Sequence, residues 1–362
     1  MNISFIVPSM GFGGAERVIS ILSKGLIEKG HKVSLGIFNV SPQKVAYTLD
    51  ERVRVEHIRS YGIRSVGKIK NTLKSIENFL HSTDTDIVLC FANTVCALVS
   101  IVAKRMNLPL IFSERNDPRR YLTSFSDKVL QKIMLKNVSY VVFQTEGAKK
   151  LYPERIRKNS VVILNPLDTS RMPDYYEGER RKVIVTVGRL QEQKRTDVLL
   201  NAFAKIAEKH PDYNLELYGK GNLEDELKAL SGTLGISDRV KFMGASSTIF
   251  QDINEAALFA LTSDFEGLPN ALLEAMALGL PCVSTKCSPG GAEELIEDGK
   301  NGYLVACGDA ATLAQRMDSM LCDYDKAIAM GKEARKVRER TDVKVIIDTW
   351  ERYINTALEN KR

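Results

Sequence analysis

The sequence predicts an α/β protein built from two doubly wound domains, each a parallel sheet covered by helices. Short β-rich runs alternate with amphipathic helical stretches along the whole chain. The alternation breaks in the polar, Pro-containing segment 165–182 and then restarts, and 362 residues suffice for two cores. We therefore expect an N-terminal domain at 1–165, a second domain at 166–341, and a C-terminal helix at 342–362 that crosses back to the first domain.

In the first half, each expected strand is a short β-rich run and each expected helix has apolar residues at helical spacing. Strands are predicted at 3–7, 32–38, 53–58, 86–91, 109–113, 139–143 and 161–163. Helices are predicted at 14–29, 67–80, 94–105 and 125–136.

The second half repeats this pattern. Strands are predicted at 183–187, 213–218, 239–243, 257–262, 281–285 and 302–305. Helices are predicted at 196–209, 222–234, 249–255, 269–278, 289–297, 309–322, 324–338 and 342–359. Ligand sites of α/β sheets lie at the carboxyl ends of the strands, so we expect the two domains to face a central cleft.

Composition restricts the class of protein. No apolar run is long enough to cross a membrane, and the N-terminal segment reads as a first strand, so we expect a cytoplasmic protein. The cysteines show no Cys-x-x-Cys spacing and no histidine lies at metal-ligand spacing, so we expect reduced thiols. The histidines, at 31, 57, 81 and 210, form no recognisable catalytic grouping by sequence.

The net charge of +6 is unevenly distributed. Residues 1–170 contain 25 Lys and Arg against 14 Asp and Glu, whereas the remainder contains 26 against 31. A basic domain points to an anionic partner, either nucleic acid or the phosphate layer of a membrane. Aromatic residues make up 7% of the chain and do not alternate with the basic residues, which disfavours binding of single-stranded nucleic acid. We therefore expect the anionic partner to be a membrane surface.

The segment EGLPNALLEAMALG, residues 266–279, carries two carboxylates eight residues apart. Glu274 lies within an apolar helix, where an ionised carboxylate needs a polar partner. Glu266 precedes the helix, and Pro269 suits its first position. The helix N-terminus offers free amides to an anion between the two carboxylates. A nucleotide sugar, with hydroxyls on both sides of a diphosphate, has this layout.

Two cations follow the first strand of the second half. Arg189 and Lys194, with Gly188, are positioned to clamp a diphosphate and to stabilise charge on a departing phosphate oxygen. Two solvated surface cations are the alternative interpretation.

The opening loop, with Gly11, Gly13 and Gly14, allows either phosphate binding or a tight turn. It does not match the dinucleotide fingerprint, because Glu16 takes the place of the third glycine.

Basic residues in the first half are candidates for contact with an acceptor. Glu114, Arg115 and Asn116 follow a strand and can reach a reacting centre, whereas Arg119 and Arg120 suit an acceptor phosphate; a solvated loop is the alternative. Helix 67–80 is amphipathic, which suits an anionic lipid surface and ordinary core packing equally well. Its candidate acceptor-binding residues are Lys68, Lys70 and Lys74.

Two Asp-x-Asp triplets, at 84–86 and 323–325, lie at the start of a strand and between helices. Both positions favour structural roles, so we predict no essential metal and no cofactor.

The segments GFGGAER, GRLQEQK, NPLD and EGLPNALLEAMALGLP resemble those of the retaining glycosyltransferases of family 4, which have the GT-B fold. The resemblance covers essentially the whole chain. It implies that Glu266 contacts the hydroxyls of the donor sugar, that Glu274 holds the ribose, and that the cations bind the diphosphate. It also places Gly14 on the phosphate and acceptor side, and we expect Gly13 beside it to contribute to donor binding. The backbone at Gly267, Leu268, Pro269 and Asn270 is expected to line the sugar and phosphate.

One position departs from that family. Many members have a histidine after the strand that ends here at Ser113, whereas this chain has Glu114 and Arg115. A guanidinium does not act as a base. The resemblance then favours a front-face retaining mechanism in which the leaving phosphate accepts the acceptor's proton and Arg115 stabilises phosphate charge.

The resemblance is greatest to bacterial enzymes of glycan, capsule and lipid-linked oligosaccharide assembly. It implies transfer of a hexose or N-acetylhexosamine from a UDP-sugar, for example UDP-GalNAc, to a polyprenyl-diphosphate-linked or other glycan acceptor. The expected location is the inner face of the cell membrane. Alternatives are transfer to a soluble acceptor, epimerisation of a nucleotide sugar, and non-catalytic binding of one.

Overall fold

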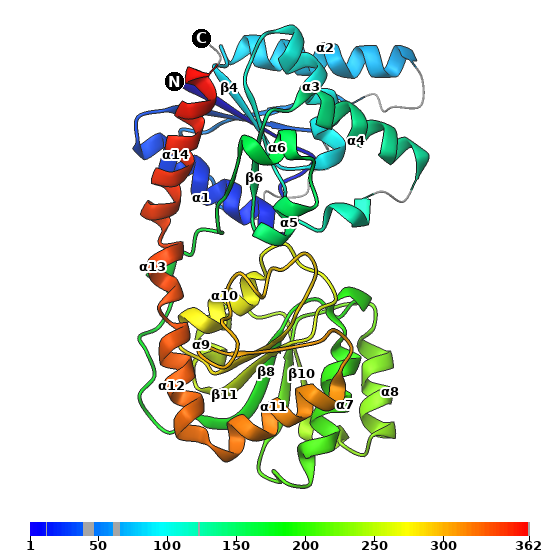
Figure 1. Cartoon of the computed structure of the whole chain (residues 1–362), viewed down its shortest axis with the longest axis vertical. Helices are drawn as coiled ribbons and strands as arrows, with labels where there is room; N and C mark the ends of the chain where they lie inside the picture. The colour runs from blue at the N-terminus through cyan, green and yellow to red at the C-terminus, as the bar shows by residue number, and fades with distance from the viewer. Residues whose placement is uncertain (12, 39–46, 61–65, 122–123, 361–362) are drawn as a thin grey trace. The chain divides into compact units, whose positions relative to one another are not determined.

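The computed structural model describes residues 1–11, 13–38, 47–60, 66–121 and 124–360. Contacts between residues divide the chain into two compact units, both visible in Figure 1. Unit 1 consists of Met1–Pro166 together with Val343–Arg362, and unit 2 is the continuous segment Leu167–Asp342. Unit 1 is therefore assembled from two pieces of chain that are far apart in the sequence.

Unit 1 contains a seven-stranded parallel sheet in the order β3-β2-β1-β4-β5-β6-β7. All seven predicted strands are confirmed. Because β1 has β2 on one side and β4 on the other, the carboxyl ends of β1 and β4 meet at a topological switch point, where α/β proteins bind ligands. The strands are β1 (Asn2–Val7), β2 (Lys32–Ile37), β3 (Arg54–His57), β4 (Ile87–Cys90), β5 (Leu110–Ser113), β6 (Tyr140–Phe143) and β7 (Ser160–Val162).

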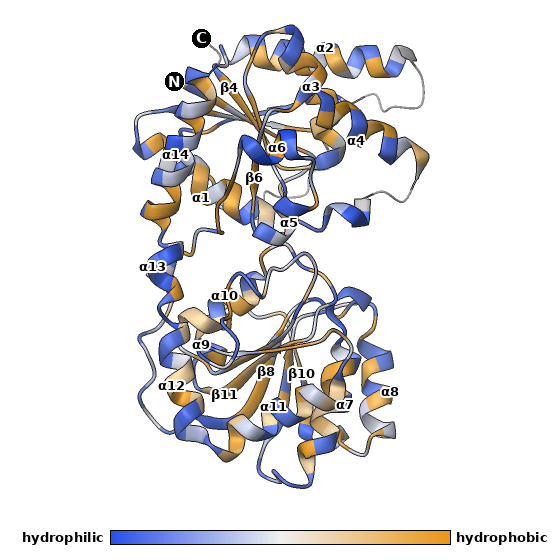
Figure 2. Cartoon of the chain, in the orientation of Figure 1, coloured by the Kyte–Doolittle hydropathy of each residue, from blue (hydrophilic) through white to orange (hydrophobic). Residues whose placement is uncertain are grey.

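The helices of unit 1 bury their apolar sides against this sheet, whose strands are hydrophobic in Figure 2. The apolar side of α2, with Leu73, Ile76 and Phe79, lies in the core, so of its two interpretations core packing is confirmed. The helices are α1 (Gly14–Glu28), α2 (Val66–Ser82), α3 (Asn93–Arg105), α4 (Phe125–Asn137), α5 (Glu146–Lys150), α6 (Glu154–Lys158) and α14 (Val343–Glu359), with a 3-10 turn η1 (Pro118–Tyr121).

The C-terminal helix α14 belongs to unit 1 and lies beside α1 (Figure 1). Trp350 is only 1% exposed and stacks on Phe91, with ring centroids 5.8 Å apart. The two helices approach closely at Gly25, where an added Cβ would lie 2.4 Å from Ile347. His31 also bonds Glu351 at 2.9 Å, so α14 completes the core of unit 1.

Unit 2 contains a six-stranded parallel sheet in the order β10-β9-β8-β11-β12-β13. All six predicted strands are confirmed. Because β8 lies between β9 and β11, the carboxyl ends of β8 and β11 form the switch point of this sheet. The strands are β8 (Arg181–Val187), β9 (Asn214–Tyr218), β10 (Val240–Gly244), β11 (Ala256–Leu261), β12 (Cys282–Thr285) and β13 (Tyr303–Val305).

Helices α7 and α11 of unit 2 pack together in one core cluster with the sheet, whereas α10 packs against α9, β11 and β12. No helix in the described part of the chain is long and apolar enough to cross a bilayer. The helices are α7 (Thr196–Ala207), α8 (Glu224–Thr233), α9 (Ile249–Asn254), α10 (Asn270–Ala277), α11 (Ala310–Cys322), α12 (Tyr324–Ala334) and α13 (Val337–Thr341), with 3-10 turns η2 (Thr169–Arg171), η3 (Glu192–Lys194) and η4 (Ser237–Arg239).

The helix predicted at 289–297 is wrong, because this segment forms a series of turns. Gly290 has φ of +96°, which lies outside the helical region, and hydrogen bonds such as that from Ile296 N to Ala292 O close single turns only. The helix predicted at 324–338 ends instead at Ala334, and α13 follows it.

Candidate functional site

The switch point of unit 2 brings together two residues that the sequence singled out. Lys194 lies in η3, and Glu266 lies in the loop after β11, 72 residues further along the chain. The Nζ of Lys194 donates a hydrogen bond to Oε1 of Glu266, and Ser263 Oγ donates to the same oxygen at 2.9 Å. Both side chains are less than one-fifth exposed. These opposite charges therefore neutralise each other.

The two loops that carry this pair are tied together by their backbones. Gln193 accepts a hydrogen bond from the backbone N–H of Asp264 at 3.0 Å, and its side chain donates to the carbonyl of Phe265 at 2.7 Å. Thr262 Oγ1 donates to the carbonyl of Lys194 at 2.8 Å. These bonds fix the geometry of the ion pair, because they hold the loop that carries Lys194 against the loop that carries Glu266.

Arg189 extends from the carboxyl end of β8 into solvent. Its guanidinium has no hydrogen-bond or ion-pair partner among the residues that the structure describes. Gly188 donates its N–H to the carbonyl of Tyr218 at 2.9 Å, and an added Cβ there would lie 3.2 Å from the Lys194 side chain. The segment therefore presents one available cation and one that is engaged with Glu266.

A supporting loop that was not predicted lies directly after β9. Gly219 has φ of +136°, and an added Cβ would lie 1.9 Å from the carbonyl oxygen of Gly188. Leu190 donates its N–H to the carbonyl of Lys220 at 3.1 Å, so the two loops are stacked backbone against backbone. The signal for this loop was present, because two glycines flank a lysine immediately after a strand.

The loop and helix that follow Glu266 are largely buried. Glu274 is 8% exposed within α10, and Leu268 is 5% exposed. Pro269 is the N-cap residue of α10 rather than its first helical residue, which is Asn270. An added Cβ at Gly291 would lie 2.1 Å from the carbonyl oxygen of Gly267, so the turns in place of the predicted helix support this loop.

At the switch point of unit 1, Gly13 is the N-cap of α1 and Gly14 is its first residue. Gly13 offers no side chain to cap this helix, and Phe12 of the predicted loop lies outside the described residues. Glu16 lies in the first turn, and burial raises the pKa of its carboxyl. The N-terminus of this long helix is a favourable environment for an anion, and the Glu16 carboxylate lies there, against Gly13.

Arg115 lies after β5 with its guanidinium packed against aromatic rings. Its Nη1 donates to Oδ1 of Asn165 at 2.8 Å, and its Cζ lies 4.7 Å from the ring centroid of Phe91. Within the described residues, its buried Nε and Nη2 have no hydrogen-bond partner. Burial lowers the pKa of Arg115 to about 9 despite the neighbouring Glu114, so the side chain remains charged at pH 7.

The other predicted acceptor contacts occupy two separate elements. Lys68, Lys70 and Lys74 are exposed on α2. In η1, Arg120 is exposed, and Arg119 forms a two-point ion pair with the buried carboxylate of Asp117, with distances of 3.0 and 2.8 Å. This pairing orients the Arg119 guanidinium but reduces its capacity to bind another anion.

The two Asp-x-Asp triplets have structural contacts. Asp86 accepts a hydrogen bond from the backbone N–H of Asn2 at 2.7 Å, and Asp323 caps α12 by accepting from Lys326 N at 3.3 Å.

Comparison with known proteins gives the class of this molecule. The family model described as Glycosyltransferase Family 4 matches residues 12–171, and the model described as Glycosyl transferases group 1 matches residues 171–337. The two sheets have the GT-B fold, and the Anabaena protein HepE, solved in complex with UDP, has a similar structure. It aligns with a TM-score of 0.85 and 23% identity over 98% of this chain and 100% of that chain.

Relatives with similar sequences span nearly the whole chain. One, from Campylobacter jejuni, is named GalNAc-alpha-(1->4)-GalNAc-alpha-(1->3)-diNAcBac-PP-undecaprenol alpha-1,4-N-acetyl-D-galactosaminyltransferase and is 27% identical over 98% of both chains. Another, the lipopolysaccharide 1,6-galactosyltransferase of Escherichia coli, is 26% identical over 86% of each. This chain belongs to glycosyltransferase family 4 and is a glycosyltransferase of that retaining family.

Proposed function

We propose that this enzyme transfers a hexose or N-acetylhexosamine from a UDP-sugar to a polyprenyl-diphosphate-linked or other glycan acceptor, with retention of anomeric configuration. The observation that carries the proposal is the pairing of Lys194 with Glu266 beside Arg189 at the switch point of unit 2. The UDP complex of HepE and the names of the Campylobacter and Escherichia relatives support the choice of donor and of a glycan acceptor.

In this proposal the donor diphosphate takes the place of Glu266 as the anionic partner of Lys194, while Arg189 binds the same diphosphate from solvent. Glu266 is then free to accept hydrogen bonds from sugar hydroxyls, and Glu274 from the ribose. Two cations on a leaving diphosphate stabilise the charge that develops as its bond to the sugar breaks. The cations take the role that a divalent metal has in other transferases, and we expect full activity with a chelator present.

The transfer step follows a front-face course. The acceptor oxygen forms a bond to the anomeric carbon as the bond from that carbon to the phosphate oxygen breaks. The departing phosphate oxygen takes the proton of the acceptor hydroxyl. Arg115 remains charged at neutral pH and contributes a positive field, because its pKa of about 9 makes it a poor base there.

Unit 1 is proposed to bind the acceptor at an anionic membrane surface. Its basic residues include the exposed lysines of α2, and α4 carries exposed apolar side chains near lysines. Phe125 and Val129 are 83% and 39% exposed, and Lys128 and Lys132 lie beside them. Exposed apolar residues among cations suit insertion at the boundary between headgroups and acyl chains. The apolar side of α2 is buried, so α2 can make this contact through its exposed lysines but not through apolar side chains.

The test of the chemistry is a transfer assay with UDP-sugars and lipid-linked or soluble glycan acceptors. Glu266→Gln and Lys194→Ala should each lower turnover about 10²–10³-fold, the range for loss of one transition-state contact. Matched controls lie at the opposite ends of the same strands: Lys182→Ala in β8 and Glu255→Gln before β11 should retain activity. Near-normal turnover in both site variants would disprove the proposed site.

The membrane part is tested separately by flotation with vesicles that contain anionic lipid. Binding should weaken as salt rises, because screening shortens the range of charge attraction. Phe125→Ser should release the protein from vesicles and leave transfer to a water-soluble acceptor intact. Equal flotation of Phe125→Ser and the parent chain would remove α4 from the proposal.

A further inference from the structure

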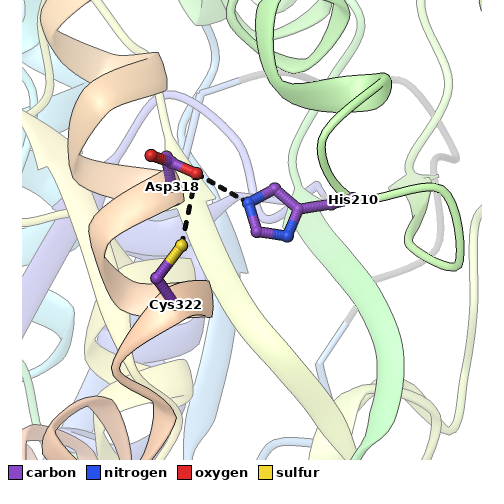
Figure 3. Close-up of side chains that lie close together, drawn as sticks. All are labelled: His210, Asp318 and Cys322. Atoms are coloured by element: carbon purple, nitrogen blue, oxygen red, sulfur yellow. Dashed lines mark hydrogen bonds and ion pairs between the residues drawn. The ribbon is translucent and has the colours of Figure 1, made fainter.

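Three potential metal ligands converge on one side of unit 2. His210 lies in the connection between α7 and β9, and Asp318 and Cys322 lie one turn apart on α11 (Figure 3). His210 Nε2 lies 2.7 Å from Asp318 Oδ1, and Cys322 Sγ lies 3.6 Å from that oxygen. The three ligand atoms all lie within 4.8 Å of one another.

The elements that carry these side chains are held firmly. Helices α7 and α11 share the core cluster of unit 2, which includes Leu313 and Met317 on α11. The backbone of His210 donates its N–H to Ile206 O at 3.0 Å and accepts at its carbonyl from Arg239 Nη2 at 2.5 Å. The Tyr213 ring packs edge-on against the imidazole with centroids 5.8 Å apart. Asp318 and Cys322 are therefore positioned by a packed helix, and His210 by the hydrogen bonds of its backbone to α7 and to Arg239.

We propose that His210, Asp318 and Cys322 bind Zn²⁺, with water as the fourth ligand. An imidazole nitrogen, a carboxylate oxygen and a thiolate are the three ligand types that zinc takes in proteins. Ligand atoms on a zinc tetrahedron lie about 3.3–3.7 Å apart, given bonds of about 2.0–2.3 Å. The contact from sulfur to oxygen already has this length, and the hydrogen-bonded imidazole needs to move outward by about half an ångström.

Lys209 is the competitor for this position. Its Nζ lies 2.7 Å from Asp318 Oδ2, the second oxygen of the same carboxylate. The Lys209 side chain is 59% exposed, so it can move into solvent when the metal supplies the positive charge.

The zinc site is separate from the proposed donor site. His210 precedes β9, so it lies at the amino end of the parallel strands, whereas Lys194 and Glu266 follow carboxyl ends. A metal here would link the end of α7 to α11 and stabilise the folded form of unit 2 by mass action. Its role is structural, and loss of the metal should leave transfer chemistry in place at low temperature.

The experiment uses the full-length chain, freed of metal and then titrated with Co²⁺ and Zn²⁺. Co²⁺ should produce a thiolate charge-transfer absorption that saturates at one equivalent of metal. Zn²⁺ should displace the Co²⁺ and abolish this absorption, and it should raise the melting temperature. Cys322→Ser should abolish the absorption, and His210→Ala should weaken Zn²⁺ binding at least about tenfold. Cys307→Ser, which alters another exposed thiol, is the matched control and should behave like the parent.

Two results would overturn the zinc proposal. One is the absence of charge-transfer absorption at millimolar Co²⁺ in the parent chain. The other is Zn²⁺ binding of parent strength in folded Cys322→Ser, which would show that the metal binds elsewhere.

Discussion

At the scale of single residues, the proposed donor site depends on close contact between backbones. An added Cβ at Gly219 would overlap the carbonyl oxygen of Gly188, and one at Gly291 would overlap that of Gly267. Both contacts support segments that carry candidate ligand-binding residues. A side chain at either position must displace the backbone that presents Arg189 or Glu266.

Gly219→Ala should therefore destabilise unit 2 and weaken UDP binding. The left-handed φ and the backbone overlap together should cost about 1–3 kcal/mol of unfolding free energy, measured by urea denaturation. Gly232→Ala in α8 is the control, because its Cβ would meet only Ser237 Oγ at 3.6 Å. That change should stabilise the helix by about 0.5–1 kcal/mol. Parent-like stability of Gly219→Ala would contradict the stacking of the two loops.

Glu16 gives a test based on pH. Burial raises the pKa of its carboxyl in the folded protein, so folding favours the protonated form. The stability that this group contributes is present below its unfolded pKa and is lost as pH rises through the folded value. Glu16→Gln should raise the melting temperature at pH 7 and leave it unchanged near pH 4. Glu28→Gln, whose side chain is 58% exposed on the same helix, should show no such difference.

The sequence predicted where individual site residues lie in the fold, but not which of their side chains contact each other. The carboxyl-end rule indicated that Lys194 and Glu266 would both lie at a ligand-binding edge. Their direct pairing could not be predicted, because it depends on how two loops 72 residues apart are held together. The contact between His210 and Asp318 could not be predicted for the same reason, since 108 residues separate them.

At the scale of elements, α14 is the most informative helix. Trp350 is its largest fully buried side chain, and it packs on Phe91 at the end of β4. Every strand of both sheets was predicted from a short β-rich run. The strands of a parallel sheet are buried on both faces, so each one is a short hydrophobic run that the sequence shows directly. The predicted helix at 289–297 failed because three residues, Pro289, Gly290 and Gly291, specify turns that brace Gly267.

Trp350→Ala should destabilise unit 1 by about 3–5 kcal/mol, the usual cost of a large core cavity. The measurement is thermal or urea unfolding of the full chain, in which the unfolding of unit 1 is followed separately from that of unit 2. Val345→Ala on the same helix is the control, because Val345 is 46% exposed, and it should change stability by less than about 1 kcal/mol. A small effect of Trp350→Ala would mean that α14 is dispensable for the core.

At the scale of the whole molecule, unit 2 is one continuous segment and unit 1 is not. Unit 1 needs both ends of the chain, since α14 supplies Trp350 to a core formed by the first 166 residues. A truncated chain that ends before Val343 loses this helix.

The fragment 167–342 should fold by itself and bind UDP, whereas the fragment 1–166 should be unfolded or aggregate. Circular dichroism and a thermal-shift series with UDP measure both outcomes, because a ligand of the folded form raises its melting temperature. A folded, soluble 1–166 fragment of parent stability would contradict the role given to α14.

The two ends of unit 2 lie next to each other, since the N–H of Leu167 donates to the carbonyl of Thr341 at 2.8 Å and Leu167 forms a bridge with Asp342. The chain therefore enters and leaves unit 2 at the same place in the structure. If the proposed function holds, exchange of residues 167–342 between two relatives would transfer the proposed donor site and leave the proposed acceptor residues of unit 1 in place.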